Sequence, residues 1–219
     1  MTTTAQTMTA VALDGLCDGF ADSTHQAQQV FRRVLAAMAE PGTVHSLEPG
    51  NAPAPLSSAA YQICLALLDQ ETPLWLQPEL ASAAVVNSLR FHCGCGIAHR
   101  SDKAAFALIT ANGDCSLAAF NQGTFEYPDR SATVIVEVRG LDAERGENCG
   151  EERSELVLEG PGIRQQRRVR IDGFDAGWMQ RLADNHASFP CGVDLILTCG
   201  NQLMALPRTT RATLIGQEH

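Results

Sequence analysis

Apolar residues recur along this chain with two periods, one typical of helices and one typical of strands. The helical period comes first, in the apolar residues Val30, Phe31, Val34, Leu35 and Met38. We expect these residues to form the buried face of one helix. The helix should end at Pro41-Gly42, because proline cannot continue a helix and glycine commonly ends one.

The same reading predicts three more helices and a set of strands. The helices are one capped by Ser57 or Ser58 and containing Ile63, Leu67 and Leu68, one over Glu79 to Phe91, and one over Phe174 to His186. The strands are Pro73 to Leu76, Ala104 to Thr110, Val134 to Val138 and Glu155 to Glu159. The charged stretch Asp142 to Arg153 is predicted to be a surface loop.

A hairpin is predicted near the C-terminus. Two apolar runs, Val193 to Cys199 and Gln202 to Leu206, are joined by Gly200-Asn201, which suits the positive φ angles of a tight turn. Asp194 begins the first of these strands. Because a lone buried carboxylate is unfavourable, we expect Asp194 either to lie at an exposed strand end or to pair with a base, and Arg208 and Arg211 are the nearest in sequence.

Composition is ordinary for a globular protein. The 219 residues are 45% hydrophobic and 19% charged, which favours one α/β domain over residues 25–219 behind a mobile segment over residues 1–24. The pattern of elements predicts helices layered on a mixed sheet. A net charge of −9 disfavours nucleic-acid binding, since it provides no basic face to neutralise phosphates.

The sequence also bears on the cellular compartment. No apolar run approaches the roughly 20 residues that a membrane-spanning helix needs. The first twenty residues lack the basic start and apolar core of a signal peptide. We therefore expect a cytoplasmic protein, not bound to membranes, whose eight cysteines are reduced.

Six segments, in order along the chain, resemble the H-subunit family of the bacterial carbon-phosphorus lyase core complex. They are FRRVLAAMAEPGTV from Phe31, TPLWL from Thr72, NSLRFH from Asn87, EYPDRSATVIVEV from Glu126, GPGI from Gly160 and FPCGVDLILTCGNQLMALPRTT from Phe189. The resemblance implies a three-layer αβα sandwich with a mixed sheet, like a reduced large domain of a pyridoxal-phosphate-dependent transferase without that cofactor. The only lysine, Lys103, lies in a polar turn, which agrees with the absence of a cofactor Schiff base.

The resemblance also implies partners. It predicts a homodimer when the protein is isolated, and otherwise a subunit that works with the other core subunits on ATP and an alkylphosphonate. The product expected from that complex is a ribose 1-phosphonate 5-triphosphate. The alternative is a stand-alone α/β transferase or hydrolase with a pocket around Arg90, His92 and Glu126.

The strongest candidate site precedes the strand at Val134. Glu126, Tyr127, Asp129 and Arg130 surround a proline turn there, and such a loop suits a ligand or a partner's basic group. The alternative is a turn in which Arg130 bonds to Asp129 or to a carbonyl. The remaining surface candidates are Arg90, His92, Asp194 and Arg208.

Three further clusters favour structural interpretations. His92, Cys93, Cys95 and His99 are ligand types that suit zinc, but their spacing is not that of a structural zinc site, so we expect no metal. No nucleophile signature accompanies the cysteines, and Cys191 and Cys199 are expected to be inert. Arg164, Arg167, Arg168 and Arg170 are expected to lie on a solvated edge strand, with phosphate or phosphonate binding as the alternative.

Overall fold

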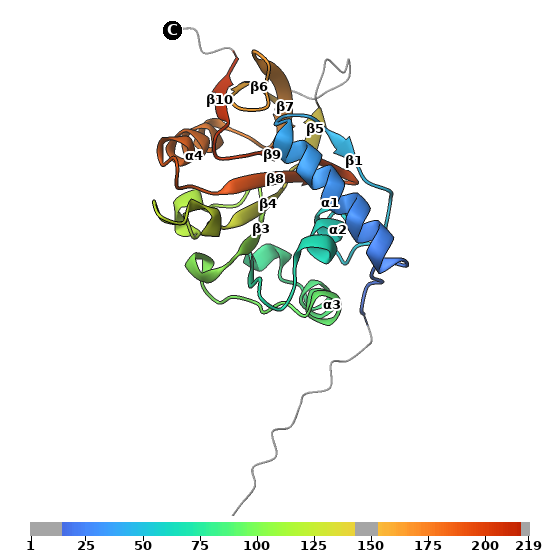
Figure 1. Ribbon diagram of the computed structural model, residues 1–219. Helices are drawn as coiled ribbons and strands as arrows, with labels where there is room; N and C mark the ends of the chain where they lie inside the picture. Colours follow the sequence, from blue (N-terminus) through green and yellow to red (C-terminus); the bar gives the residue numbers. More distant parts are fainter. Residues whose placement is uncertain (1–14, 143–152, 216–219) are drawn as a thin grey trace, which may run out of the picture.

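A computed structural model describes residues 15–142 and 153–215, in which the strands form two sheets (Figure 1). The large sheet contains, in spatial order, β1 (His45–Ser46), β9 (Gln202–Leu206), β8 (Asp194–Cys199), β4 (Thr133–Glu137), β3 (Phe106–Thr110) and β2 (Leu74–Leu76). Strands β8, β4, β3 and β2 are parallel, whereas β9 and β1 are antiparallel to their neighbours. The expected mixed sheet is thereby confirmed.

Three helices cover one face of the large sheet. They are α1 (Ser23–Ala39), α2 (Ser58–Leu67) and α3 (Ala83–Cys93). Ile63 of α2 and Leu89 of α3 are fully buried with Leu108, Ile135 and Ile196 of the sheet. The central strands are apolar at successive positions because both of their faces are covered.

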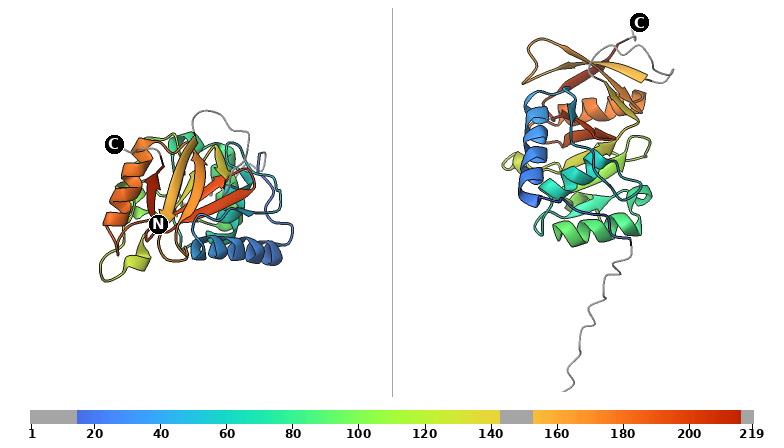
Figure 2. Two further views of the ribbon diagram at one scale, coloured as in Figure 1. Left: turned by 90° about the horizontal axis from the view of Figure 1, so that it is seen from above. Right: turned by 90° about the vertical axis from the view of Figure 1, so that its right-hand side faces the viewer.

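The opposite face is covered by a second sheet and one helix (Figure 2). This antiparallel sheet has the order β10 (Arg211–Leu214), β6 (Arg153–Glu159), β7 (Arg167–Asp172) and β5 (Gly140–Asp142), and α4 (Ala176–Ala187) lies beside it. Trp178 of α4 stacks on Phe174 with ring centroids 4.3 Å apart and donates from Nε1 to the Ala111 carbonyl at 2.7 Å. The predicted αβα sandwich therefore needs correction on this side, where β-strands occupy part of a helical layer.

Local signals explain where the helices begin. The hydroxyl of Ser57 caps α2 by accepting from the Ala60 N–H at 3.1 Å, as one of the two predicted serines. The predicted helix over Glu79 to Phe91 is wrong at its start, because a short 3-10 turn, η1 (Pro78–Leu80), precedes Ser82, which caps α3. The remaining short 3-10 turns are η2 (Ser101–Lys103), η3 (Leu117–Ala119) and η4 (Pro128–Arg130).

Helix α1 corrects the expected buried face. Its buried residues are Val30, Val34 and Ala37, whereas Phe31 is 50% exposed and Leu35 is 57% exposed. Phe31 and Leu35 are one turn apart, so they lie on the same side of the helix, rotated away from the sheet. The sequence of α1 contains two adjacent apolar stripes, and its periodicity did not distinguish which of them packs against the sheet.

The C-terminal hairpin forms as predicted, with Cys199 paired to Gln202. Gly200 has a φ of +58°, whereas no described residue other than glycine has a positive φ, so the expectation for Asn201 was wrong. The Asn201 side chain instead donates to the Leu47 carbonyl at 2.8 Å, which joins the turn to the segment after β1.

The expected arginine edge strand is corrected in part. Strand β7 lies between β6 and β5, but β5 pairs only with residues 170–172, so Arg170 is paired on both sides whereas Arg167 and Arg168 have a strand partner only in β6. Arg164 lies outside β7. Most of the predicted loop between Asp142 and Arg153 lies outside the described residues, as do residues 1–14. Within the predicted mobile N-terminal segment, the Cys17 N–H donates to the Ser88 hydroxyl of α3 at 3.0 Å. Across the described ranges, none of the helices has the length and apolar character needed to span a bilayer.

Candidate functional site: a braced surface loop

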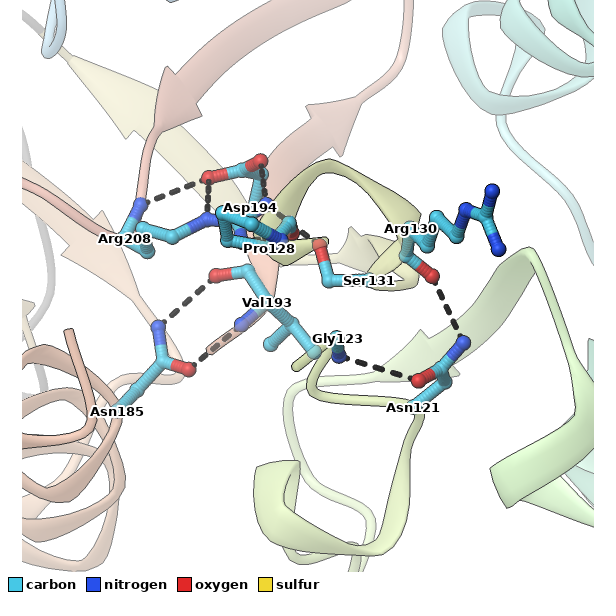
Figure 3. Close-up of polar contacts among 9 residues, drawn as sticks. All are labelled: Asn121, Gly123, Pro128, Arg130, Ser131, Asn185, Val193, Asp194 and Arg208. Atoms are coloured by element: carbon cyan, nitrogen blue, oxygen red, sulfur yellow. Dashed lines mark hydrogen bonds and ion pairs between the residues drawn. The ribbon is translucent and has the colours of Figure 1, made fainter. Parts of the chain in front are cut away.

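Residues 121–131, which we call the site loop, lead into β4 at its amino end (Figure 3). Asn121 closes the loop: its side-chain Nδ2 donates to the Arg130 carbonyl at 2.7 Å, and its Oδ1 accepts from the Gly123 N–H at 3.1 Å. Its carbonyl also accepts from the Ala132 N–H at 2.7 Å. One asparagine thus bonds to residues at both ends of the loop.

Gly123 allows the loop to fold back on itself. Its φ is +70°, and a Cβ at this position would lie 2.8 Å from the Pro128 carbonyl oxygen. Thr124 and Tyr127 add two bonds, since the Thr124 N–H donates to the Tyr127 carbonyl at 3.2 Å and the Tyr127 N–H donates to the Thr124 hydroxyl at 3.0 Å. Only glycine combines this backbone conformation with such a close approach.

The site loop rests on an ion pair between Asp194 and Arg208. The Arg208 backbone N–H and Nε donate to Asp194 Oδ1 at 2.9 and 3.1 Å, and Nη2 donates to Oδ2 at 2.6 Å. Arg208 also donates to the Pro128 carbonyl at 2.7 Å and to the Ser131 hydroxyl (Figure 3). The predicted pairing of Asp194 with Arg208 is therefore confirmed.

This ion pair is largely shielded from solvent where it supports the loop. The Arg208 side chain is 12% exposed and the Asp194 side chain 26% exposed. The contact is bidentate and charge-assisted, and it is partly shielded from water. Removing either partner would destabilise the protein, because the remaining charge would be left desolvated and unpaired. Arg211, the other predicted partner, is an exposed residue at the start of β10.

Asn185 of α4 holds the backbone of Val193, directly before β8, by two hydrogen bonds. This residue was not identified from the sequence. Its Nδ2 donates to the Val193 carbonyl at 2.9 Å, and its Oδ1 accepts from the Val193 N–H at 2.8 Å. The residue is 7% exposed. A single asparagine in a polar stretch of a helix gives no sign of this role, because its partner is a backbone unit after the helix.

The tip of the site loop is exposed, as predicted for Glu126, Asp129 and Arg130. Tyr127 is 43% exposed, and the Arg130 guanidinium lies over its ring at 4.3 Å from the centroid. Arg130 thus makes a cation–π contact, which was not among the interpretations weighed from the sequence. The sequence reading also missed Phe125, which is 82% exposed and directly precedes Glu126.

Arg90 and His92 lie elsewhere, in the last turn of α3 in the helical layer (Figure 1). Both are exposed, and His92 Nε2 lies 2.9 Å from the Cys17 carbonyl. Among the described residues, no hydrogen bond, ion pair or ring contact links either of them to Glu126. The pocket around these three residues stays a prediction.

The thiols near α3 contact carbonyl groups. Cys93 Sγ donates to the Cys64 carbonyl at 3.5 Å, and Cys95 Sγ is 3.9 Å from the Leu89 carbonyl. Burial raises the pKa of the Cys64 thiol, which disfavours the thiolate needed for nucleophilic attack or metal binding. In the described part of the chain, no three His, Cys, Asp or Glu side chains are grouped so that they could hold a metal ion.

The β7 arginines line an open cleft of about 1040 Å³ between the small sheet and the segment around Ser46. Arg167 donates to the Glu40 carbonyl at 3.1 Å and to that of Pro41. Arg170 lies 3.7 Å from a carboxylate oxygen of Glu155. Two of these guanidinium groups therefore already have partners, and Arg168 is the exposed one.

The opposite end of β4 carries a second partly buried acid. Glu137 Oε1 accepts from the Ser57 N–H at 2.6 Å, and Oε2 accepts from the Thr198 hydroxyl at 3.1 Å. Burial raises the pKa of the Glu137 carboxyl, although these hydrogen bonds oppose the shift. The carboxylate thus satisfies an N–H at the start of α2.

The fold and the site define an α/β protein that presents a rigid surface loop. The chain belongs to the bacterial phosphonate metabolism protein (PhnH) family, whose model matches residues 18–213.

Two curated relatives are similar over most of their length. The alpha-D-ribose 1-methylphosphonate 5-triphosphate synthase subunit PhnH of Rhizobium meliloti (strain 1021) is 36% identical over 196 residues, covering 88% of this chain and 92% of the relative. The putative C-P lyase subunit protein HtxG of Stutzerimonas stutzeri is 31% identical over 190 residues, covering 86% and 87%. The resemblance inferred from the sequence is confirmed at the level of the family.

Proposed function

We propose that this chain is a subunit of a carbon-phosphorus lyase system, in which partner subunits join an alkylphosphonate to the ribose C1 of ATP and release adenine. The product is a ribose 1-phosphonate 5-triphosphate. The observation that carries the proposal is the match to relatives named as subunits of such systems over 88% and 86% of the chain. In this role the chain contributes a surface and requires no complete active site of its own.

The geometry supports a subunit role over a stand-alone enzyme. Arg90 and His92 lie on α3, while Glu126 lies on the site loop. The polar residues that do meet, Asp194 and Arg208, are engaged with each other and with the loop backbone. A catalytic pair needs a group free to exchange protons or attack a substrate, and these two support the fold instead.

The proposal extends to partners and location. ATP and the phosphonate reach the chain through the complex, the isolated protein forms a homodimer, and the protein is cytoplasmic. The fold is proposed to be a reduced version of the large domain of pyridoxal-phosphate-dependent transferases. The position of Lys103 supports the expectation that the cofactor is missing. Its side chain is 72% exposed and its amine lies 3.9 Å from an Asp102 carboxylate oxygen, so it is not placed in a pocket where it could form the cofactor's Schiff base.

Adenine release tests the function directly. The purified chain with ATP and methylphosphonate is expected to release no adenine, whereas the chain combined with its partner subunits is expected to release it. Omitting this chain from the mixture should abolish or strongly reduce the reaction. Adenine release by the chain alone would instead establish the enzyme alternative.

Spectroscopy and elemental analysis test the cofactor expectation. The isolated protein should show no aldimine absorption band and no stoichiometric zinc. A band that disappears in Lys103→Ala, or one equivalent of zinc that disappears in Cys95→Ser, would contradict it.

A further inference from the structure

The tip of the site loop combines an apolar centre with acidic neighbours. Phe125 is 82% exposed, and Glu126 and Asp129 beside it are exposed as well. Large apolar side chains that are exposed singly are common on proteins, so exposure alone assigns no role. The rigidity and the charge of this loop distinguish it from such cases.

The loop is held in one conformation before any partner binds. The Asn121 side chain bonds to the backbone of Gly123 and Arg130 inside the loop, and Arg208, outside the loop, donates to the Pro128 carbonyl. The Gly192 N–H also donates to the Gln122 carbonyl at 3.0 Å, which ties the loop to the segment containing Phe189, itself 58% exposed. A loop backbone that is fixed in this way loses little conformational entropy on binding, so more of the free energy of burying Phe125 appears as affinity.

The charge of the tip indicates the chemistry of the partner. The tip carries the carboxylates of Glu126 and Asp129, neither of which has an ion-pair partner among the described residues, and one guanidinium, Arg130, which lies over the Tyr127 ring. The formal charge of the tip is therefore negative, and the whole chain carries a net charge of −9. A protein interface usually has an apolar core and a polar rim. The complementary surface is therefore an apolar socket with a basic rim.

We infer that Phe125 is an anchor that inserts into an apolar, lysine- or arginine-rimmed socket on another subunit of the complex, with Glu126 and Asp129 facing that rim. This inference rests on the proposed function, since it names the surface through which the chain joins its partners. A second copy of this chain fits the surface less well. A two-fold contact through the tip would place four carboxylates and only two guanidinium groups around one centre, and the excess of like charge at an interface is unfavourable.

The test measures binding of the full chain to the other co-purified subunits of the system. Phe125→Ala should weaken binding about thirtyfold, as expected for a central aromatic anchor, without changing the melting temperature. Phe91→Ala is the matched control, because Phe91 is 58% exposed on α3, and it should bind as wild type does. Glu126→Lys with Asp129→Lys should slow association and reduce its salt dependence, because rim charges act mainly on the association rate.

The outcomes separate the two proposals. If the wild-type chain does not bind the partner subunits, the proposed function fails and this inference fails with it. If wild type binds and Phe125→Ala binds equally well, the subunit role stands and the anchor assignment is overturned. Equal losses in Phe125→Ala and Phe91→Ala would also overturn it, as would an effect of Phe125→Ala on self-association alone.

Discussion

A partly buried carboxylate lies near each end of strand β4, and the two are stabilised by different means. At its amino end, the first residue pairs with Asp194 of β8, whose carboxylate is matched by the Arg208 guanidinium. At its carboxyl end, Glu137 is held by neutral donors, the Ser57 N–H and the Thr198 hydroxyl. The first arrangement supports a surface loop, and the second supports the start of a helix.

Burial and charge pairing of a side chain indicate whether it stabilises the fold or is available for contacts at the surface. Arg208 contacts the site loop and Arg130 belongs to it, but Arg208 is 12% exposed with its charge paired, whereas Arg130 is exposed over a tyrosine ring. The base of the loop should therefore determine stability, and the tip should determine association. Four substitutions along β4 and the loop test that division.

Ile135→Ala, in the middle of β4, should have the largest effect. Ile135 is fully buried, so we expect a loss of about 2 to 5 kcal/mol in the free energy of unfolding, measured by urea denaturation. Ile135→Val serves as control and should cost only about 0.5 to 1.5 kcal/mol. An equally small effect of both would mean that the strand is not the core element described.

Arg208→Ala should come next, with a loss of about 2 to 4 kcal/mol, because the half-buried Asp194 carboxylate loses its cation and the loop loses two donors. The measurement is again chemical denaturation. Arg211→Ala is the matched control, since Arg211 is exposed, and should change stability by about 0.5 kcal/mol or less. Similar losses in both variants would show that the ion pair has no special role.

Glu137→Gln should change how stability depends on pH. Because burial raises the pKa of Glu137 in the folded state, the folded protein keeps this proton at a pH where the unfolded chain has lost it. Wild-type stability should therefore fall as pH rises from the unfolded pKa through the folded one, by at most about 1.4 kcal/mol per pH unit, and this component should vanish in the variant.

Denaturation curves between pH 4 and pH 7, compared with those of the exposed control Glu79→Gln, measure the difference. A wild-type contribution that instead increases with pH would show that the hydrogen bonds to Glu137 outweigh its desolvation.

Arg130→Ala should have the smallest effect on stability, about 0 to 1 kcal/mol, since an exposed cation–π contact contributes little. Binding to the partner subunits should nevertheless weaken, because the Tyr127 ring at the tip loses the group that covers it. This loss is expected to outweigh the relief of repulsion between Arg130 and a basic rim. Thermal unfolding beside a pull-down measures both quantities in one preparation. Unfolding as severe as that of Ile135→Ala would make the tip structural, and unchanged stability and binding would leave Arg130 as a solvated turn residue.

Much of the fold was predictable because its signals are local. Ser57 caps α2, Pro41-Gly42 follows α1, and Gly200 turns the hairpin. The helix over Glu79 to Phe91 was misplaced at its start, because apolar periodicity continued across the serine cap at Ser82. The covering of one sheet face by β-strands was also missed, since an amphipathic strand does not specify the surface on which it packs.

Half of the candidate site was likewise predictable. The exposed turn at Glu126 to Arg130 and the pairing of Asp194 with Arg208 follow from turn chemistry and from the cost of burying an unpaired charge. Asn121, Asn185 and Phe125 were not identified. The two asparagines bond to backbone groups in other segments, and the exposure of a phenylalanine depends on what surrounds it.

The sequence by itself determined the family, the mixed order of helices and strands, and the need of Asp194 for a partner, because each depends on residue identity or on near neighbours in the chain. Only the tertiary structure decided which α1 stripe is buried, which strands cover the second face, and that Arg208 reaches Pro128 and Ser131 across the site loop. These outcomes depend on contacts between segments far apart in sequence. Periodicity shows that a surface must be covered but does not specify what covers it.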